Sequence, residues 1–243
     1  MDMKVLITND DGILAPVLPS LIAFVKTFAS EVVVVAPKVE QSGKSQAIEF
    51  YREVEIKEVD LAPDLKVWAM DSTPADCVRF GVLGLHQTYD LVLSGINRGL
   101  NVGHDIVYSG TVGAIYEGSR LGIHGIALSS APEDLEHALA QLDEVWAWIT
   151  SQDLLSHNLL YNVNFPREAK GIRITKQGGV FFSDGFARRE GDMYIQVGAP
   201  VTEYGQDLNM DIDAIRNGYV SVTPLAAERT DWVAFEALKH LKA

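Results

Sequence analysis

The stretch that decides the fold of this 243-residue chain is Lys4-Val5-Leu6-Ile7-Thr8-Asn9-Asp10-Asp11-Gly12. Its first part, Lys4 to Ile7, predicts a short buried strand. Apolar residues then recur at helical spacing from Val17 to Phe28, and the β-branched run Val32-Val33-Val34-Val35 predicts a second buried strand. A helix between two buried strands indicates a βαβ unit.

Strand and helix continue to alternate beyond this unit. Thr73 fits a helix N-cap, Pro74 the first helical position and Asp76 the third, so we expect a helix to about Leu85. The next predicted elements are a strand at Leu91–Leu93, a helix at Thr111–Leu121, a strand at Gly125–Ser129 and a helix at Leu135–Ile149. This order predicts an α/β protein with a doubly wound, mostly parallel sheet covered on both faces.

The pattern changes after Pro166, where short strand candidates are separated by Gly, Asp and Asn. We expect one domain over residues 1–243, with residues 167–225 as a β-hairpin appendage and a final helix from Asp231 to Leu241. Projecting hairpins leave exposed edges, so pairing with another subunit is expected. The candidate strands are Ile172–Thr175, Val180–Ser183, Met193–Val197 and Tyr219–Thr223.

The composition limits the partners that the chain can bind. A formal net charge of -13 opposes binding to nucleic acid polymers and anionic membranes, whereas a small phosphate ester remains possible if a bound cation supplies positive charge. Cys77 is the single cysteine, which excludes an internal disulfide and a cysteine-based zinc site and favours a reducing compartment. The charged start and short apolar run fit a cytoplasmic strand better than a signal peptide.

Three predicted strands lead into polar, glycine-containing segments, which are Thr8–Gly12, Glu40–Ser45 and Ser94–Gly99. In open α/β sheets, ligands bind just beyond the carboxyl ends of the strands. We therefore expect these three segments to meet at one edge of the sheet.

Adjacent carboxylates at Asp10 and Asp11 repel each other unless a cation lies beside them. With Ser42 and Asn97 they would form an all-oxygen ligand set, which favours magnesium, manganese or calcium over zinc. The alternative is that Asp-Asp-Gly forms a solvated turn, because Asp and Gly are common in turns. The position after a buried strand favours the metal site.

Neighbouring residues in these loops are candidates for substrate contacts: Asn9, Gly43, Lys44 and Arg98. The positive side chains of Lys44 and Arg98 suit contacts with a phosphate, but each could equally be an ordinary surface charge. Residues Ser42 to Ser45 are similar to part of a phosphate-binding P-loop, but the full pattern fails because its first glycine is absent.

A long polar loop, Gly99 to Thr111, leads into the helix predicted at Thr111. Amides at a helix N-terminus favour anions, so Ser109, Gly110 and Thr111 could hold a phosphate. Equally, Ser109 or Thr111 could cap its own helix, and both roles are compatible. His104 in this loop is a weaker candidate, because a single histidine is more often a scaffold or surface residue.

The ordered set of these motifs resembles the SurE family of 5'/3'-nucleotidases, known as stationary-phase survival proteins. The resemblance covers most of the chain. It rests on Ile7–Gly12, Val35–Pro37 with Ser42-Gly43, Thr73–Val78, Ser94–Gly99, Tyr108–Val112, Asn162–Pro166 and Gly218–Leu225.

The resemblance implies a Rossmann-like core whose hairpin and C-terminal segment are exchanged between subunits, in a homodimer or homotetramer. It implies one divalent cation per subunit, Mg or Mn, held by Asp10, Asp11, Ser42 and Asn97, with Ser109-Gly110-Thr111 on the phosphate side. The implied activity is hydrolysis of nucleoside 5'- and 3'-monophosphates and of short polyphosphate.

Three departures from the family pattern affect the expected site. Gln41 stands where many members carry a basic residue, and Glu49 stands where many carry threonine. Residues 226–232 also lack a histidine that some members have. The first two bear on phosphate affinity and the third on any catalytic role of the tail.

Two routes of hydrolysis fit these residues. In one, the cation polarises the phosphoryl group and lowers the pKa of a water that attacks phosphorus, with Asp10, Asp11 and Asn97 in the catalytic centre. In the other, Asp10 attacks directly and forms an aspartyl phosphate. A dinucleotide-dependent dehydrogenase is disfavoured because its glycine fingerprint is missing after the first strand, whereas a non-catalytic nucleotide sensor remains an alternative.

Overall fold

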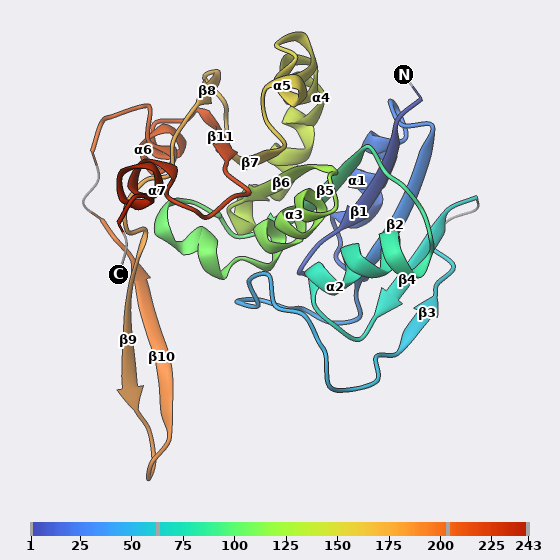
Figure 1. The fold of residues 1–243 in the computed structure, drawn as a ribbon, viewed down its shortest axis with the longest axis horizontal. Coiled ribbons are helices and arrows are strands. Elements are labelled where there is room, and N and C mark those ends of the chain that lie inside the picture. The colour runs from blue at the N-terminus through green and yellow to red at the C-terminus, as the bar shows by residue number, and fades with distance from the viewer. Residues whose placement is uncertain (1, 62–63, 203–204, 242–243) are drawn as a thin grey trace.

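A nine-stranded sheet forms the centre of the computed structural model, which describes residues 2–61, 64–202 and 205–241 (Figure 1). Its strand order is β3-β4-β2-β1-β5-β6-β7-β11-β8. The six strands from β4 to β7 in this order are parallel, whereas β3 pairs antiparallel with β4, and β11 pairs antiparallel with β7. The strands are β1 (Lys4–Thr8), β2 (Glu31–Pro37), β3 (Ile56–Glu58), β4 (Lys66–Met70), β5 (Leu91–Arg98), β6 (His124–Ser130), β7 (Leu160–Phe165), β8 (Ile172–Ile174) and β11 (Val220–Leu225).

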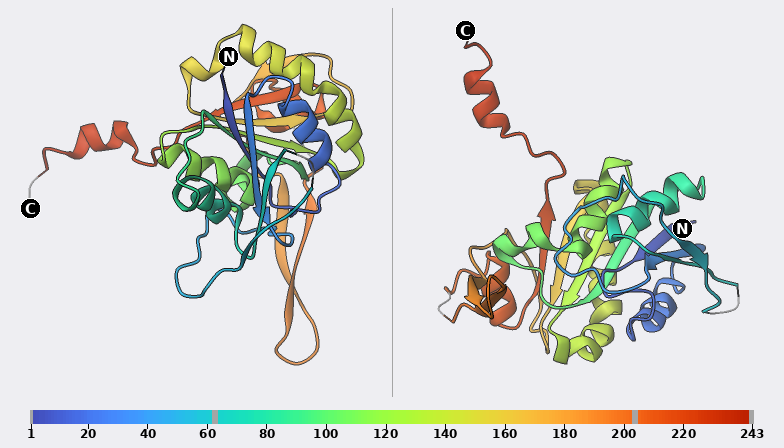
Figure 2. Two further views of the ribbon diagram at one scale, coloured as in Figure 1. Left: turned by 90° about the vertical axis from the view of Figure 1, so that its right-hand side faces the viewer. Right: turned by 90° about the horizontal axis from the view of Figure 1, so that it is seen from below.

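Helices cover both faces of this sheet, as the right-hand view of Figure 2 shows. Alternate residues of β1 point to opposite faces, so Val5 and Ile7 pack in one core cluster and Leu6 in another. The first cluster includes α1 (Leu18–Val25) and α4 (Leu135–Ser151), and the second includes α2 (Pro74–Arg79) and α3 (Gly110–Arg120). This arrangement confirms the predicted doubly wound α/β class.

The start of α2 follows the predicted capping pattern. Thr73 is its N-cap and accepts a hydrogen bond from the Asp76 backbone N–H at 3.2 Å, and Pro74 is its first residue. A π-helical turn at Phe80–Gly84 continues the segment almost to the predicted end. Other boundaries differ: α1 ends at Val25 rather than Phe28, and the last helix, α7 (Trp232–Leu238), is shorter than expected.

Strand β5 is longer than the sequence predicts, because it runs through the polar segment to Arg98. Its pairing with β6 shifts register between Ser94 and Asn97. Gly95 lies in this shift with a φ of +133°, and a Cβ there would be 2.3 Å from the Leu128 carbonyl oxygen. Only glycine fits this close approach, and Asn97 is therefore carried on a strand end rather than on a loop.

Residues 167–225 contain two different structures. Strands β8 and β11 pair with each other in parallel and join the edge of the central sheet beside β7. By contrast, β9 (Phe182–Arg188) and β10 (Tyr194–Pro200) form a separate antiparallel hairpin that projects from the body (Figure 1). The chain between hairpin and β11 includes the short helix α6 (Asp211–Arg216), which the sequence pattern does not predict.

The hairpin and the C-terminal segment extend away from the core (Figure 2). Phe186 on the hairpin is 75% exposed, and Val233 on α7 is 83% exposed. Within the described part of the chain, every helix is too short or too polar to cross a membrane.

Candidate active site

A cleft of about 640 Å³ lies beyond the carboxyl ends of β1 and β5. It brings together the three polar segments that follow separate strands, as the fold class requires. Seven predicted site residues line it: Asp10, Asp11, Ser42, Gly43, Asn97, Arg98 and Ser109. The other described lining residues are Glu40, Leu100, Asn101, Asp105, Tyr108 and Phe182.

Asp10 is the most buried carboxylate of the cleft, with 5% of its surface exposed. Its Oδ1 accepts a hydrogen bond of 2.6 Å from the Thr111 hydroxyl, which fixes the carboxylate against α3. Burial is the main reason that the pKa of Asp10 is raised to about 6; the Thr111 hydrogen bond opposes this rise and the neighbouring Asp11 charge contributes to it. The site therefore disfavours a negative charge here unless a cation is bound.

Asp11 is half-buried on the other side of the turn. Its Oδ2 accepts the backbone N–H of Arg98 at 3.2 Å, which joins the end of β1 to the end of β5. Burial again raises the pKa of Asp11, and Glu40 adds to the shift, whereas the backbone and charge of Arg98 oppose it. Two neighbouring carboxylates thus share a region that favours added positive charge.

Asn9 shapes the turn rather than lining the cleft. The buried side chain donates to the Gly12 carbonyl at 3.0 Å and accepts the Gly12 N–H at 2.9 Å. These two bonds close the turn that presents Asp10 and Asp11. Asn9 therefore acts on the site by holding its backbone, which differs from the direct substrate contact that the sequence suggests.

The loop after β2 reaches the same cleft through the backbone. Gln41 N–H donates to the Asp10 carbonyl at 2.7 Å, which places Ser42 beside the two aspartates. The Ser42 hydroxyl donates to Glu40 Oε1 at 2.6 Å, so Glu40 is a further acidic residue of this cleft. Lys44 is exposed and is not among the described lining residues. Glu40 could have been recognised from its position at the head of this loop.

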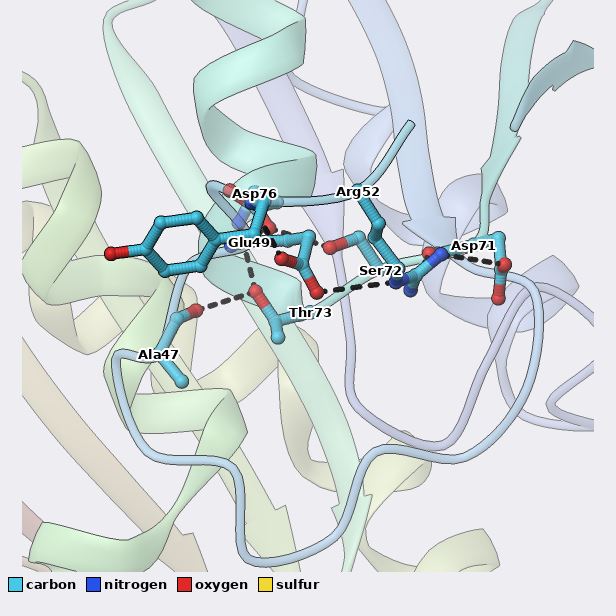
Figure 3. A network of polar contacts seen from close by, with 8 residues as sticks. Ala47, Glu49, Arg52, Asp71, Ser72, Thr73 and Asp76 are labelled. Atoms are coloured by element: carbon cyan, nitrogen blue, oxygen red, sulfur yellow. Dashed lines mark hydrogen bonds and ion pairs between the residues drawn. The ribbon is translucent and has the colours of Figure 1, made fainter. Parts of the chain in front are cut away.

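Figure 3 shows how the far end of this loop is held. Glu49 N–H donates to Asp76 Oδ2 at 2.8 Å, and the Glu49 carboxylate pairs with Arg52 Nε at 3.1 Å. Arg52 also pairs with Asp71 at 3.0 Å, and the Thr73 hydroxyl donates to the Ala47 carbonyl at 2.6 Å. Glu49, the departure noted in the sequence, thus helps to anchor the loop to the start of α2.

Hydrogen bonds of one half-buried and three buried asparagines fix the chain that follows β5. The Asn97 amide nitrogen donates to the Gly99 carbonyl at 2.8 Å, which leaves its oxygen as the atom suited to a cation. Asn162 and Asn164 of β7 both donate to the Asn101 carbonyl at 2.8 Å. The alternation of these asparagines with Tyr161, Val163 and Phe165 is the sequence signal for β7, whose polar face supports the cleft.

The start of α3 lies against Asp10. A Cβ on Gly110 would be 3.1 Å from the Asp10 Cβ, and Thr111 bonds to the Asp10 carboxylate. Ser109 caps its own helix by accepting the Val112 N–H at 3.1 Å, one of its two expected roles, while it also lines the cleft. The N-terminus of α3 therefore lies beside Asp10, and its unpaired backbone amides favour binding of an anion such as phosphate there.

The loop before α3 joins the cleft to the hairpin. Asp105 Oδ2 accepts the Phe182 backbone N–H at 3.1 Å, so the first residue of β9 lies at the cleft wall. The His104 backbone donates to the Gly179 carbonyl at 2.8 Å, and His104 is outside the described lining. Sequence reasoning does not find Asp105 or Phe182, because they meet only through the folding of distant segments.

The donor set fits a hard divalent cation. Asp10, Asp11, Ser42 and Asn97 supply carboxylate, hydroxyl and amide oxygens, and both carboxylates are destabilised by burial. Across residues 2–61, 64–202 and 205–241, no three His, Cys, Asp or Glu side chains form a group suited to a metal. A cation in this cleft would therefore depend on the serine and asparagine oxygens as well.

Comparison with known proteins gives consistent matches over most of the chain. The family described as survival protein SurE matches residues 5–184. Similar curated proteins include the 5'-nucleotidase SurE of Desulforudis audaxviator, 34% identical over 98% of this chain and 96% of its own length. That of Paramagnetospirillum magneticum is 38% identical over 98% and 95%. The crystal structure of the SurE protein from Aquifex aeolicus has a TM-score of 0.80 and 31% identity, covering 98% of both chains.

Proposed function

This chain belongs to the SurE family, and from that premise we propose that it hydrolyses nucleoside monophosphates to nucleoside and phosphate. The name 5'-nucleotidase carried by its relatives supports this reaction. The observation that carries the proposal is the cleft in which Asp10, Asp11, Ser42 and Asn97 lie together beside the N-terminus of α3. That cleft combines a cation-binding donor set with a helix end that favours phosphate.

The finer proposal is a metal-dependent enzyme that accepts both 5'- and 3'-monophosphates and short polyphosphate. One Mg or Mn ion per subunit would be held by Asp10, Asp11, Ser42 and Asn97. When bound, such an ion supplies a Lewis acid for the phosphoryl group and a water of lowered pKa. The burial of both carboxylates supports this proposal, because a cation relieves the unfavourable burial of their charge.

The side chains around the cleft have separate roles in the proposed reaction. Thr111 fixes one oxygen of Asp10, and the Arg98 backbone fixes one oxygen of Asp11. The amides of Gly110 and Thr111 at the start of α3 stabilise negative charge on the phosphate. Arg98 lines the cleft and adds a positive side chain at its wall.

The nucleophile is either water or Asp10 itself. In the first route Asp10 is a ligand of the cation and also the base for the attacking water. Direct attack would instead leave phosphate on the Asp10 carboxylate. Rapid acid quenching during turnover followed by mass spectrometry of the Asp10 peptide distinguishes the two, because only direct attack places a transient phosphoryl group on that carboxylate.

We also propose that the chain acts in the cytoplasm as a homodimer or homotetramer, with nucleotides as its small-molecule partners. The exposed apolar residues of the hairpin support subunit pairing, since Phe186 is 75% and Met193 68% exposed. The net charge of -13 argues against nucleic acid polymers and membranes as partners.

The proposal is tested by phosphate release from a panel of nucleoside 5'- and 3'-monophosphates with Mn²⁺, Mg²⁺ or a chelator. We expect release only with a cation, and loss of release in Asp10→Asn. Asp143→Asn is the matched control, because its carboxylate lies exposed on α4, outside the cleft and the hairpin. Nucleotide binding without phosphate release under any condition would instead support the nucleotide sensor.

A further inference from the structure

A second hollow of about 340 Å³ lies beside the cleft. Ser109 lines both, so the two hollows meet at the start of α3. The proposed hydrolysis does not use this second hollow, which we call the side pocket. Its described lining residues are Ser45, Gln46, Ile106, Val107, Ser109, Gly113, Tyr116, Gln177 and Arg229.

The side pocket runs along one face of α3, starting from the end that meets Asp10. Ser109, Gly113 and Tyr116 are spaced at i, i+4 and i+7, which places them on the same face over about 10 Å of helix. The opposite wall is the loop that carries Ser42. A Cβ on Gly113 would be 2.2 Å from the Ser45 carbonyl oxygen, so this glycine lets loop and helix approach. The pocket thus extends away from the phosphate end of the cleft.

Tyr116 and Arg229 give the side pocket two flat surfaces. The Arg229 guanidinium carbon is 5.7 Å from the centre of the Tyr116 ring, and Arg229 Nη2 donates to Gln46 Oε1 at 3.2 Å. Arg229 comes from the tail after β11, far from α3 in the sequence. Aromatic rings and guanidinium planes are the surfaces on which nucleobases stack in proteins.

The Gln46 side chain is held in place by a buried glutamate. Its Nε2 donates to Glu117 Oε2 at 3.1 Å, and the buried Glu117 pairs with Arg79 at 2.9 Å and Arg120 at 3.0 Å. The orientation of the Gln46 amide is therefore fixed, and its oxygen faces Arg229. A fixed amide edge next to flat surfaces suits hydrogen bonding to the edge of a base.

The boundary between the side pocket and the cleft, which we call the rim, is formed by Ser45 with Val107 of the side pocket and Tyr108 of the cleft. The Ser45 hydroxyl donates to the Val107 carbonyl at 2.7 Å, and the Ser45 N–H donates to the Tyr108 carbonyl at 2.9 Å. Val107 is 57% and Tyr108 60% exposed, so the rim lies at the surface.

We propose that the side pocket binds the base of the nucleoside monophosphate, with the sugar over the Ser45 rim and the base against Tyr116 and Arg229. This inference rests on the proposed hydrolysis of nucleotides and identifies the residues that recognise the nucleoside. A second phosphate fits less well, because Ile106 and Val107 make part of the wall apolar.

The test compares nucleoside 5'-monophosphates with ribose 5-phosphate, which has the same phosphate and sugar but lacks the base. We expect Arg229→Ala to lower kcat/KM for the nucleotides by about 10-fold, from the loss of one stacking surface, and to change that for ribose 5-phosphate by less than about twofold. Arg229→Lys keeps the charge but not the planar group, so it should behave like Arg229→Ala.

Arg167→Ala is the matched control, because it removes the same charge from an exposed arginine outside the described lining of both hollows. It should leave the ratio of the two substrates unchanged. Equal loss for both substrates, no loss for either, or full rescue by Arg229→Lys would overturn the base-binding role while hydrolysis itself stands. Absence of phosphate release from both substrates by the wild type would overturn the proposed function and this inference together.

Discussion

Replacing Asp10 by asparagine should change how the stability of the cation-free protein depends on pH. Burial raises the pKa of Asp10 from 3.8 to about 6. A tenfold change in proton affinity corresponds to about 1.4 kcal/mol, so this rise in pKa disfavours the charged folded state by about 3 kcal/mol at pH 8. The cost of burying this one charged carboxylate is therefore large compared with the total free energy of unfolding of a single domain, about 5–15 kcal/mol.

The sign follows from the raised pKa. The folded protein holds the Asp10 proton more tightly than the unfolded chain, so the stabilisation is fully present below the unfolded pKa near 4 and is lost as the pH rises through about 6. The amide side chain introduced by Asp10→Asn cannot ionise and lacks this pH dependence. Between pH 4 and pH 8, the free energy of unfolding should therefore fall by about 3 kcal/mol more in the wild type than in Asp10→Asn.

The assay is urea unfolding in EDTA at several values between pH 4 and pH 8, with free energies of unfolding compared between wild type and variant at each pH. Asp143→Asn should follow the wild type, because its side chain is exposed on α4. Added Mn²⁺ should stabilise the wild type more than Asp10→Asn at pH 8. A pH-independent difference between Asp10→Asn and wild type in EDTA would show that Asp10 ionises normally and would refute the argument from burial.

Three further predictions concern other parts of the chain. Thr111→Val removes the hydrogen bond to Asp10 and should raise the Mn²⁺ concentration for half-maximal phosphate release by about tenfold with little change in fold, as followed by Mn²⁺ titration of activity and circular dichroism; an unchanged Mn²⁺ requirement would contradict it. Gly113→Ala places a methyl group against the Ser45 carbonyl and should destabilise by about 1–3 kcal/mol in urea unfolding while lowering kcat/KM. Phe186→Ser on the hairpin should reduce the oligomer mass in light scattering without altering monomer secondary structure; an unchanged mass would argue against subunit pairing there.

The sequence by itself determines the class of fold and the place of the site. Buried strands such as Val32–Val35 and the Thr73-Pro74 helix start depend on local preferences for backbone shape and on burial, which neighbouring residues specify. Parallel strands in turn fix the edge at which their carboxyl ends meet. The proximity of Asp10, Ser42 and Asn97 could therefore be predicted from the order of the elements alone.

Contacts between distant segments decide the rest. β5 extends to Arg98 because Gly95 fits against Leu128 of the neighbouring strand, and β8 joins β11 in parallel where the sequence suggests a hairpin. The side pocket requires Arg229 to reach Gln46 from the other end of the chain. Such contacts follow from the packing of the whole chain, because no local pattern encodes which remote backbone or side chain will lie opposite.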